Sequence, residues 1–113
     1  QVLRDPKLAR AIYAMHQQPG VNWKVAELAR EAGTSRSVFA ERFLTATGTT
    51  PARYLTELRM RLAAQYISDE GLPLEKVAFR LGYSSLAAFS RAFKRITGKA
   101  PGALRDLSGE EGF

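Results

Sequence analysis

The apolar residues of this chain recur at the spacing of an α-helix. Phe89, Phe93 and Ile96 stand at i, i+4 and i+7, so they share one face of a predicted helix over 84–98. Similar stripes, bounded by Pro, Gly or capping residues, predict six more helices: about 6–18, 23–31, 35–47, 51–70, 73–81 and 101–107. No stretch shows the period-two alternation of a strand. The predicted fold class is therefore all-α, with seven helices.

Helix ends are marked by residues with known end preferences. Asp5 before Pro6 predicts an N-cap followed by Pro at the first helical position. Asn22 is expected to cap the second helix, which would start at Trp23. Gly33 is expected to end that helix, because a helix often ends at a glycine in the left-handed conformation. Together these signals predict a helix, a tight turn and another helix.

The chain contains an internal repeat. Five residues recur 50 positions later: Phe39, Phe43, Thr47, Gly48 and Pro51 become Phe89, Phe93, Thr97, Gly98 and Pro101. Two more recur 49 positions later: Ala29 and Gly33 become Ala78 and Gly82. Such a repeat predicts two helix-turn-helix subdomains, at 1–50 and 71–107, joined by a connecting helix at 51–70 and followed by a frayed tail at 108–113.

Charge is distributed unevenly over the 113 residues. The chain has 17 basic and 11 acidic residues, a net charge of +6 and a pI near 10.1. No acidic residue lies between Glu75 and Asp106, whereas seven basic residues do. A localised basic excess is typical of nucleic-acid-binding domains.

Several other function classes find no support. The chain has no Cys and a single histidine, His16, which we expect to be a surface or packing residue. Neither a nucleophile with its base nor a phosphate-binding glycine loop is present, so we predict no enzyme activity and no cofactor. No apolar run approaches a membrane span, and the absence of Cys agrees with a cytoplasmic location.

Two segments carry a resemblance to a known family. The segments LRMRLAAQYI and VAFRLGYSSLAAFSRAFKRITGKAPGALR, with the two helix-turn-helix copies, resemble the C-terminal DNA-binding domain of AraC/XylS-family bacterial transcription regulators. The resemblance implies a bilobal fold whose two recognition helices enter adjacent major-groove segments of double-stranded DNA. It also implies an effector-binding or dimerisation domain before Gln1, and contact with RNA polymerase. Because the chain begins with Gln rather than Met, we expect it to be part of a longer protein.

The second copy supplies most of the predicted DNA contacts. Arg91 lies opposite the phenylalanines, matches a base-contacting position of the family, and has the fork geometry that reads guanine. Leu86 and Ala87 offer apolar contact to thymine methyl groups. The remaining candidates are expected at phosphates: Ser84, Ser85, Ser90, Lys94, Arg95 and Lys99. The alternative is that these side chains are solvated surface groups.

The first copy has a weakly basic outward face. Arg36 stands at the helix start, and Ser37, Ala40, Glu41 and Leu44 point outward. Glu41, at the position of Arg91, could accept from a cytosine amino group or repel phosphates at wrong sites, or be a plain surface residue. We expect the second copy to carry most of the electrostatic affinity and the first to contribute mainly discrimination.

Residues outside the two recognition helices receive structural assignments. Trp23, Tyr54, Tyr66 and Tyr83 are expected to pack in the core or between lobes. The arginines of the connecting helix are expected on its exposed side, in solvent rather than on phosphate: Arg53, Arg59 and Arg61.

The rival functions are a helical protein-interaction module whose basic face binds an acidic partner, and a DNA-modifying enzyme with its chemistry outside this chain.

Overall fold

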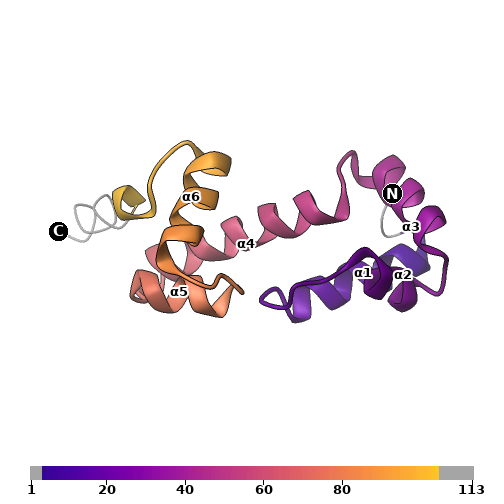
Figure 1. Cartoon of the computed structure of the whole chain (residues 1–113), viewed down its shortest axis with the longest axis horizontal. Coiled ribbons are helices and arrows are strands. Elements are labelled where there is room, and N and C mark those ends of the chain that lie inside the picture. Colours follow the sequence, from indigo (N-terminus) through magenta and orange to yellow (C-terminus); the bar gives the residue numbers. More distant parts are fainter. Residues whose placement is uncertain (1–3, 105–113) are drawn as a thin grey trace. The chain divides into compact units, whose positions relative to one another are not determined.

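A computed structural model describes residues 4–104 of the chain (Figure 1). The helices are α1 (Pro6–Gln17), α2 (Val25–Ala32), α3 (Arg36–Thr47), α4 (Pro51–Ser68), α5 (Leu74–Arg80) and α6 (Leu86–Thr97). Residues 101–104 form the first turn of the predicted seventh helix, whose end at Leu107 and the tail lie outside the described residues. Within 4–104 no residue is in a strand, and the all-α prediction is confirmed. No helix in this range is long and apolar enough to cross a membrane.

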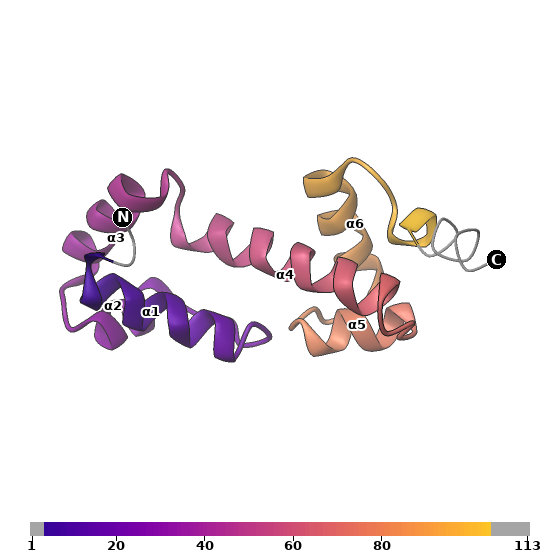
Figure 2. The ribbon, with the colours of Figure 1, turned by 180° about the vertical axis from the view of Figure 1, so that it is seen from behind.

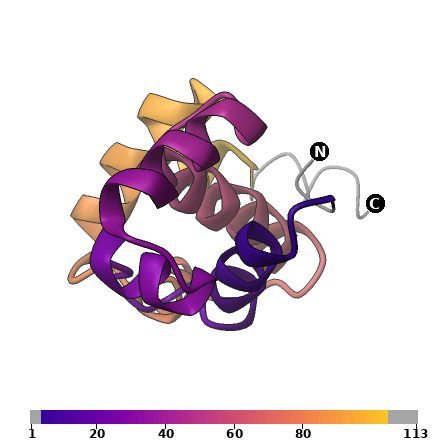
Figure 3. The same ribbon diagram turned by 90° about the vertical axis from the view of Figure 1, so that its right-hand side faces the viewer.

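The chain folds as two compact units, residues 1–56 and 57–113, and their boundary falls within α4. In the first unit α1 lies beside α2, and α3 packs against both (Figure 2 and Figure 3). Its buried hydrophobic core residues are Leu8, Ala11, Met15, Leu28, Ala29, Ala32, Phe39, Phe43 and Leu55. The two phenylalanines of α3 thus reach the core, as the periodicity predicts.

Tyr54 links the start of α4 to the rest of the first unit. Its ring meets Phe43 edge-on, with ring centroids 5.5 Å apart and planes at 90°. Its hydroxyl lies 2.9 Å from Nε2 of His16, which is exposed on α1. Tyr54 is therefore half-buried and packs against the core of the first unit, and His16 is exposed at the surface.

The second unit has its own core around α6. Phe89 and Phe93 are buried among residues of α4, α5 and the α5 end: Met60, Ala63, Ile67, Val77, Ala78 and Leu81. Tyr83 packs on Phe89 with ring centroids 5.7 Å apart. Leu62 and Tyr66 of α4 are partly buried against this core.

The two turns inside the helix-turn-helix units have matching geometry. In the first, Thr34 N donates to Ala29 O at 3.0 Å; in the second, Tyr83 N donates to Ala78 O at the same distance. Gly33 and Gly82 have φ of 73° and 88°, a region that residues with a Cβ rarely adopt. The predicted role of these glycines in the turns is confirmed.

Arg10 of α1 stabilises the turn after α2 through two side-chain hydrogen bonds. Its Nε donates to Glu31 O and its Nη2 to Ala32 O, both at 3.2 Å. A guanidinium at the carboxyl end of a helix satisfies carbonyls that have no partner within the helix and complements the helix dipole. Hydrophobic periodicity does not reveal this contact, because Arg10 falls on the exposed side of α1.

The predicted start of α2 is wrong. The helix begins at Val25, and Lys24 rather than Asn22 occupies the cap position. Glu27 Oε1 accepts from the Lys24 N–H at 2.9 Å, so the acidic residue in the first turn satisfies that amide. Trp23 stays outside the helix, where its indole N–H donates to Gln18 O at 2.9 Å.

The predicted cap of α1 is confirmed. The Asp5 side chain accepts hydrogen bonds from Lys7 N at 3.1 Å and Leu8 N at 3.3 Å. Pro6 follows at the first helical position, where its missing N–H costs nothing. The aspartate therefore satisfies two amides that have no partner within the helix.

The predicted exposure of the α4 arginines is wrong for Arg59. Arg53 and Arg61 are exposed, but Arg59 is only 6% exposed. Its guanidinium lies over the Tyr83 ring, 5.4 Å from the centroid, and a flat cation is attracted to an aromatic face. Arg59 therefore ties α4 to the turn before α6.

A threonine at the last position of α3 and of α6 closes the turn that follows each of these helices. Thr47 Oγ1 donates to Phe43 O at 2.8 Å and accepts from Thr49 N at 3.3 Å. Thr97 repeats both bonds, with Phe93 O at 2.7 Å and Lys99 N at 3.3 Å. These bonds explain why threonine recurs before the glycine in both copies.

We expect Thr47→Val to lower the free energy of unfolding by about 1–2 kcal/mol, because the isosteric side chain makes neither hydrogen bond. Urea denaturation followed by circular dichroism measures the change. Thr45→Val on the exposed side of α3 is the matched control and should change stability by less than about 0.5 kcal/mol. Equal destabilisation by both variants would contradict a specific role for the Thr47 hydroxyl.

Candidate nucleic-acid interface

The two recognition helices, α3 and α6, are positioned in the same way. Each has 12 residues and begins after a serine cap: Ser35 Oγ accepts from Val38 N at 3.3 Å, and Ser85 Oγ accepts from Ala88 N at 3.1 Å. Each ends at a glycine with positive φ. Because each helix also buries two phenylalanines, its rotation about its own axis is fixed, and so is the set of residues that it presents outward.

The outward face of α6 is small and cationic. Arg91, Lys94 and Arg95 are exposed, and so is Ala87. Leu86 and Ser90 are half-buried at the flanks, while Lys99 is exposed beyond the end of the helix. The structure therefore brings the predicted residues of the second copy onto one accessible helix face and its margins.

The serines before α6 differ in their roles. Ser84 and Ser85 are both exposed, but Ser85 Oγ accepts the hydrogen bond that caps α6. The Ser85 hydroxyl can still donate its hydrogen to a phosphate, because capping uses only an acceptor lone pair. Ser85 was predicted only as a DNA contact, and the structure adds a structural role.

The outward face of α3 carries little positive charge. Arg36, Ser37, Glu41 and Leu44 are exposed, and Ala40 is half-buried. Leu44 is 52% exposed at the position where α6 has Lys94. The weakly basic face predicted for the first copy is therefore present as an exposed surface.

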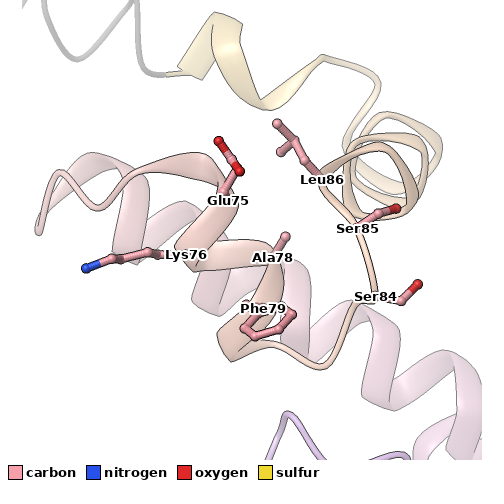
Figure 4. Close-up of a pocket in the computed structure, with 7 residues that line it drawn as sticks. All are labelled: Glu75, Lys76, Ala78, Phe79, Ser84, Ser85 and Leu86. Atoms are coloured by element: carbon pink, nitrogen blue, oxygen red, sulfur yellow. The ribbon is translucent and has the colours of Figure 1, made fainter.

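A hollow lies beside the start of each recognition helix. In the first unit it has a volume of about 580 Å³ and is lined by Val25, Ser35, Arg36, Ser37 and Ala40. In the second it has a volume of about 370 Å³ and is lined by Glu75, Lys76, Ala78, Phe79, Ser84, Ser85 and Leu86 (Figure 4). Each hollow contains the capping serine, so predicted contact residues lie at the rim of an open surface depression.

Phe79 lies at this surface and was not among the residues predicted to contact DNA. It belongs to α5, lines the second hollow and is 78% exposed. The sequence contained a signal for it, because the apolar stripe of Val77, Ala78 and Leu81 leaves Phe79 on the other side of the helix.

Within residues 4–104, no group of three or more His, Asp or Glu side chains could hold a metal ion.

The comparisons with known proteins agree on one family. A family model described as a helix-turn-helix domain matches residues 28–106. The chain is 43% identical over 103 residues to an AraC-like transcription regulator of Streptomyces antibioticus, covering 91% of this chain and 34% of that protein. It is 42% identical over 105 residues to the RCS-specific transcriptional activator RclR of Escherichia coli K12, covering 93% and 37%. The chain thus spans about a third of the length of these curated relatives.

Solved structures share the fold. An AraC-type transcriptional regulator from Chromobacterium violaceum superposes with a TM-score of 0.87 at 24% identity, covering 96% of each chain. The DNA-binding domain of AdpA, solved in complex with a target DNA, superposes with a TM-score of 0.81 at 29% identity, covering 91% of this chain and 92% of that one. The chain belongs to the AraC/XylS family of transcription regulators and corresponds to their helix-turn-helix DNA-binding domain.

Proposed function

We propose that this domain reads double-stranded DNA with α3 and α6, each placed in a segment of the major groove. Two such helices would read segments about one helical turn, roughly 34 Å, apart. The observation that carries the proposal is the cationic face of α6, where Arg91, Lys94 and Arg95 are exposed while two phenylalanines of the same helix are buried. The structure of the similarly folded AdpA domain in complex with a target DNA supports DNA binding by this fold.

Within α6 the proposal assigns base reading to Arg91 and phosphate contact to Lys94 and Arg95. An arginine fork matches the O6 and N7 acceptors of guanine, whereas lysine acts on phosphate as a mobile point charge. Ser84, Ser85 and Ser90 would donate hydroxyl hydrogens to phosphates near the start of the helix. Leu86 and Ala87 would contribute apolar contact to bases.

Within α3 the proposal assigns Arg36 to phosphate and Ser37, Ala40 and Glu41 to the base edges. Glu41 would accept a hydrogen bond from a cytosine amino group and disfavour sites where it met a phosphate. The two helices then contribute differently: α6 supplies most of the electrostatic affinity, and α3 supplies discrimination.

The parent protein would act in the bacterial cytoplasm, with a further effector-binding or dimerisation domain and contact to RNA polymerase. The support is the length of the relatives, about two and a half times that of this chain, together with the activator role stated in the name of RclR.

The test of the DNA-binding proposal is titration with random duplex DNA at two salt concentrations. A fall in affinity with salt supports it, and no binding to any duplex favours the protein-interaction alternative.

We expect Arg91→Ala to weaken binding to the preferred duplex by about 1–3 kcal/mol and to relax the preference at one base pair. Competition binding against duplexes carrying each base pair at each position measures both effects. If the variant bound preferred and random DNA more weakly by the same factor, Arg91 would be a phosphate contact rather than a base reader.

Lys94 lies about one helical turn further along α6. We expect Lys94→Ala to weaken binding to preferred and random duplexes by the same factor. Removing one phosphate contact should reduce the slope of log affinity against log salt by about 0.9. Fluorescence anisotropy over a salt series measures that slope, and the Arg91→Ala variant provides the comparison for specificity. An unchanged salt slope would remove Lys94 from the interface.

A further inference from the structure

We propose that Leu44 is a specificity-determining residue that reads the C5-methyl group of a thymine in the DNA segment bound by α3. The proposal rests on the proposed function, because it takes α3 to lie in the major groove. It goes beyond that function by assigning base recognition to an apolar residue where α6 carries a lysine.

Leu44 lies on the outward face of α3. Ser37, Glu41 and Leu44 stand at i, i+4 and i+7, so these three side chains share one face of the helix, and all three are exposed. The helix cannot roll to bury Leu44, because Phe39 and Phe43 are 1% and 0% exposed in the core. Leu44 therefore stays on the side of α3 that the DNA would meet.

The two copies differ in chemistry at this position. Leu44 corresponds to Lys94 in α6, and both helices have the same length, the same serine cap and the same glycine end. Both side chains are exposed, so the fold does not require an apolar residue here. A lysine suits a phosphate, whereas a leucine gains nothing from the charged backbone of DNA.

The major groove offers an apolar partner at one kind of base. Its base edges present hydrogen-bond donors and acceptors, and the thymine methyl is its apolar group. Ala40, four residues before Leu44 and therefore adjacent to it on the helix, is small and leaves room for close approach on that side. An apolar side chain 52% exposed on this face therefore matches thymine better than any other base.

The helix geometry gives the proposal a register. Glu41 and Leu44 are three residues apart, a rise of about 4.5 Å along α3. Base pairs are stacked roughly 3.4 Å apart. The thymine read by Leu44 should therefore lie one or two base pairs from the pair read by Glu41.

The experiment first selects preferred duplexes from a random pool with the unmodified chain. Each thymine of the selected site is then replaced in turn by deoxyuridine, which retains base pairing and the O4 acceptor and lacks only the methyl group. We expect one replacement to weaken binding by about three- to fivefold, as for the removal of one buried methyl group. With Leu44→Ala the same replacement should change affinity less than about twofold, because the side chain that meets the methyl is absent.

Two further variants test whether the effect of the thymine methyl group depends on Leu44 specifically. Val38→Ala shortens another exposed apolar residue of α3, 41% exposed and on a different side of the helix, and should keep the full sensitivity to deoxyuridine. Leu44→Lys places the residue of α6 on α3; it should abolish the sensitivity and steepen the salt slope by about 0.9, as for one added phosphate contact. A double-mutant cycle between Leu44→Ala and the methyl deletion isolates the pairwise contact.

Three outcomes would overturn the proposal while leaving DNA binding intact: a selected site in which no deoxyuridine replacement weakens binding, a sensitivity that persists in Leu44→Ala, and an equal loss of sensitivity in Val38→Ala. Any of them would make Leu44 an idle surface residue or a contact for another protein. Failure to bind any duplex would instead overturn the proposed function and this inference with it.

Discussion

The fold depends above all on the burial of two phenylalanines in each recognition helix. Phe39 and Phe43 fill the core of the first unit, and Phe89 and Phe93 fill that of the second. Two rings at i and i+4 hold a helix against its neighbours and fix its rotation about its axis. The outward residues of α3 and α6 are then set by the core, so that the proposed base and phosphate contacts would not have to be ordered at the moment of binding.

Much of this arrangement could be predicted from the sequence because it rests on repeated local signals. The phenylalanine stripes, the alanine and glycine of each turn and the Thr-Gly pairs at the ends of α3 and α6 all recur, and each acts over a few residues. The exposure of Arg91, Lys94 and Glu41 follows from the same periodicity. These predictions needed no knowledge of contacts between distant parts of the chain.

The predictions that were wrong or absent concern contacts between separate segments. Arg59 was assigned to solvent, yet Tyr83, 24 residues later, gives its guanidinium an aromatic partner inside the unit. Arg10 closes the end of α2 across about 20 residues, and no local signal reveals it. The start of α2 was misplaced because Asn22 is a good cap by type, whereas the bonds of Trp23 and Glu27 set the helix start. Tertiary partners decide where local preference allows several outcomes.

The repeat also separates what the fold requires from what recognition requires. Residues shared by the two copies are those that bury rings, form the turns or close the loops, whereas the outward positions differ: Glu41, Leu44 and Thr45 against Arg91, Lys94 and Arg95. Because both sets stand on the same scaffold, exchanging them would cost little stability. Long-range attraction to phosphate acts on every sequence alike, while a carboxylate and an apolar side chain would depend on the particular bases that they met. Under the proposed function, two helices with different outward residues would therefore combine general affinity for DNA with local selectivity in one small domain.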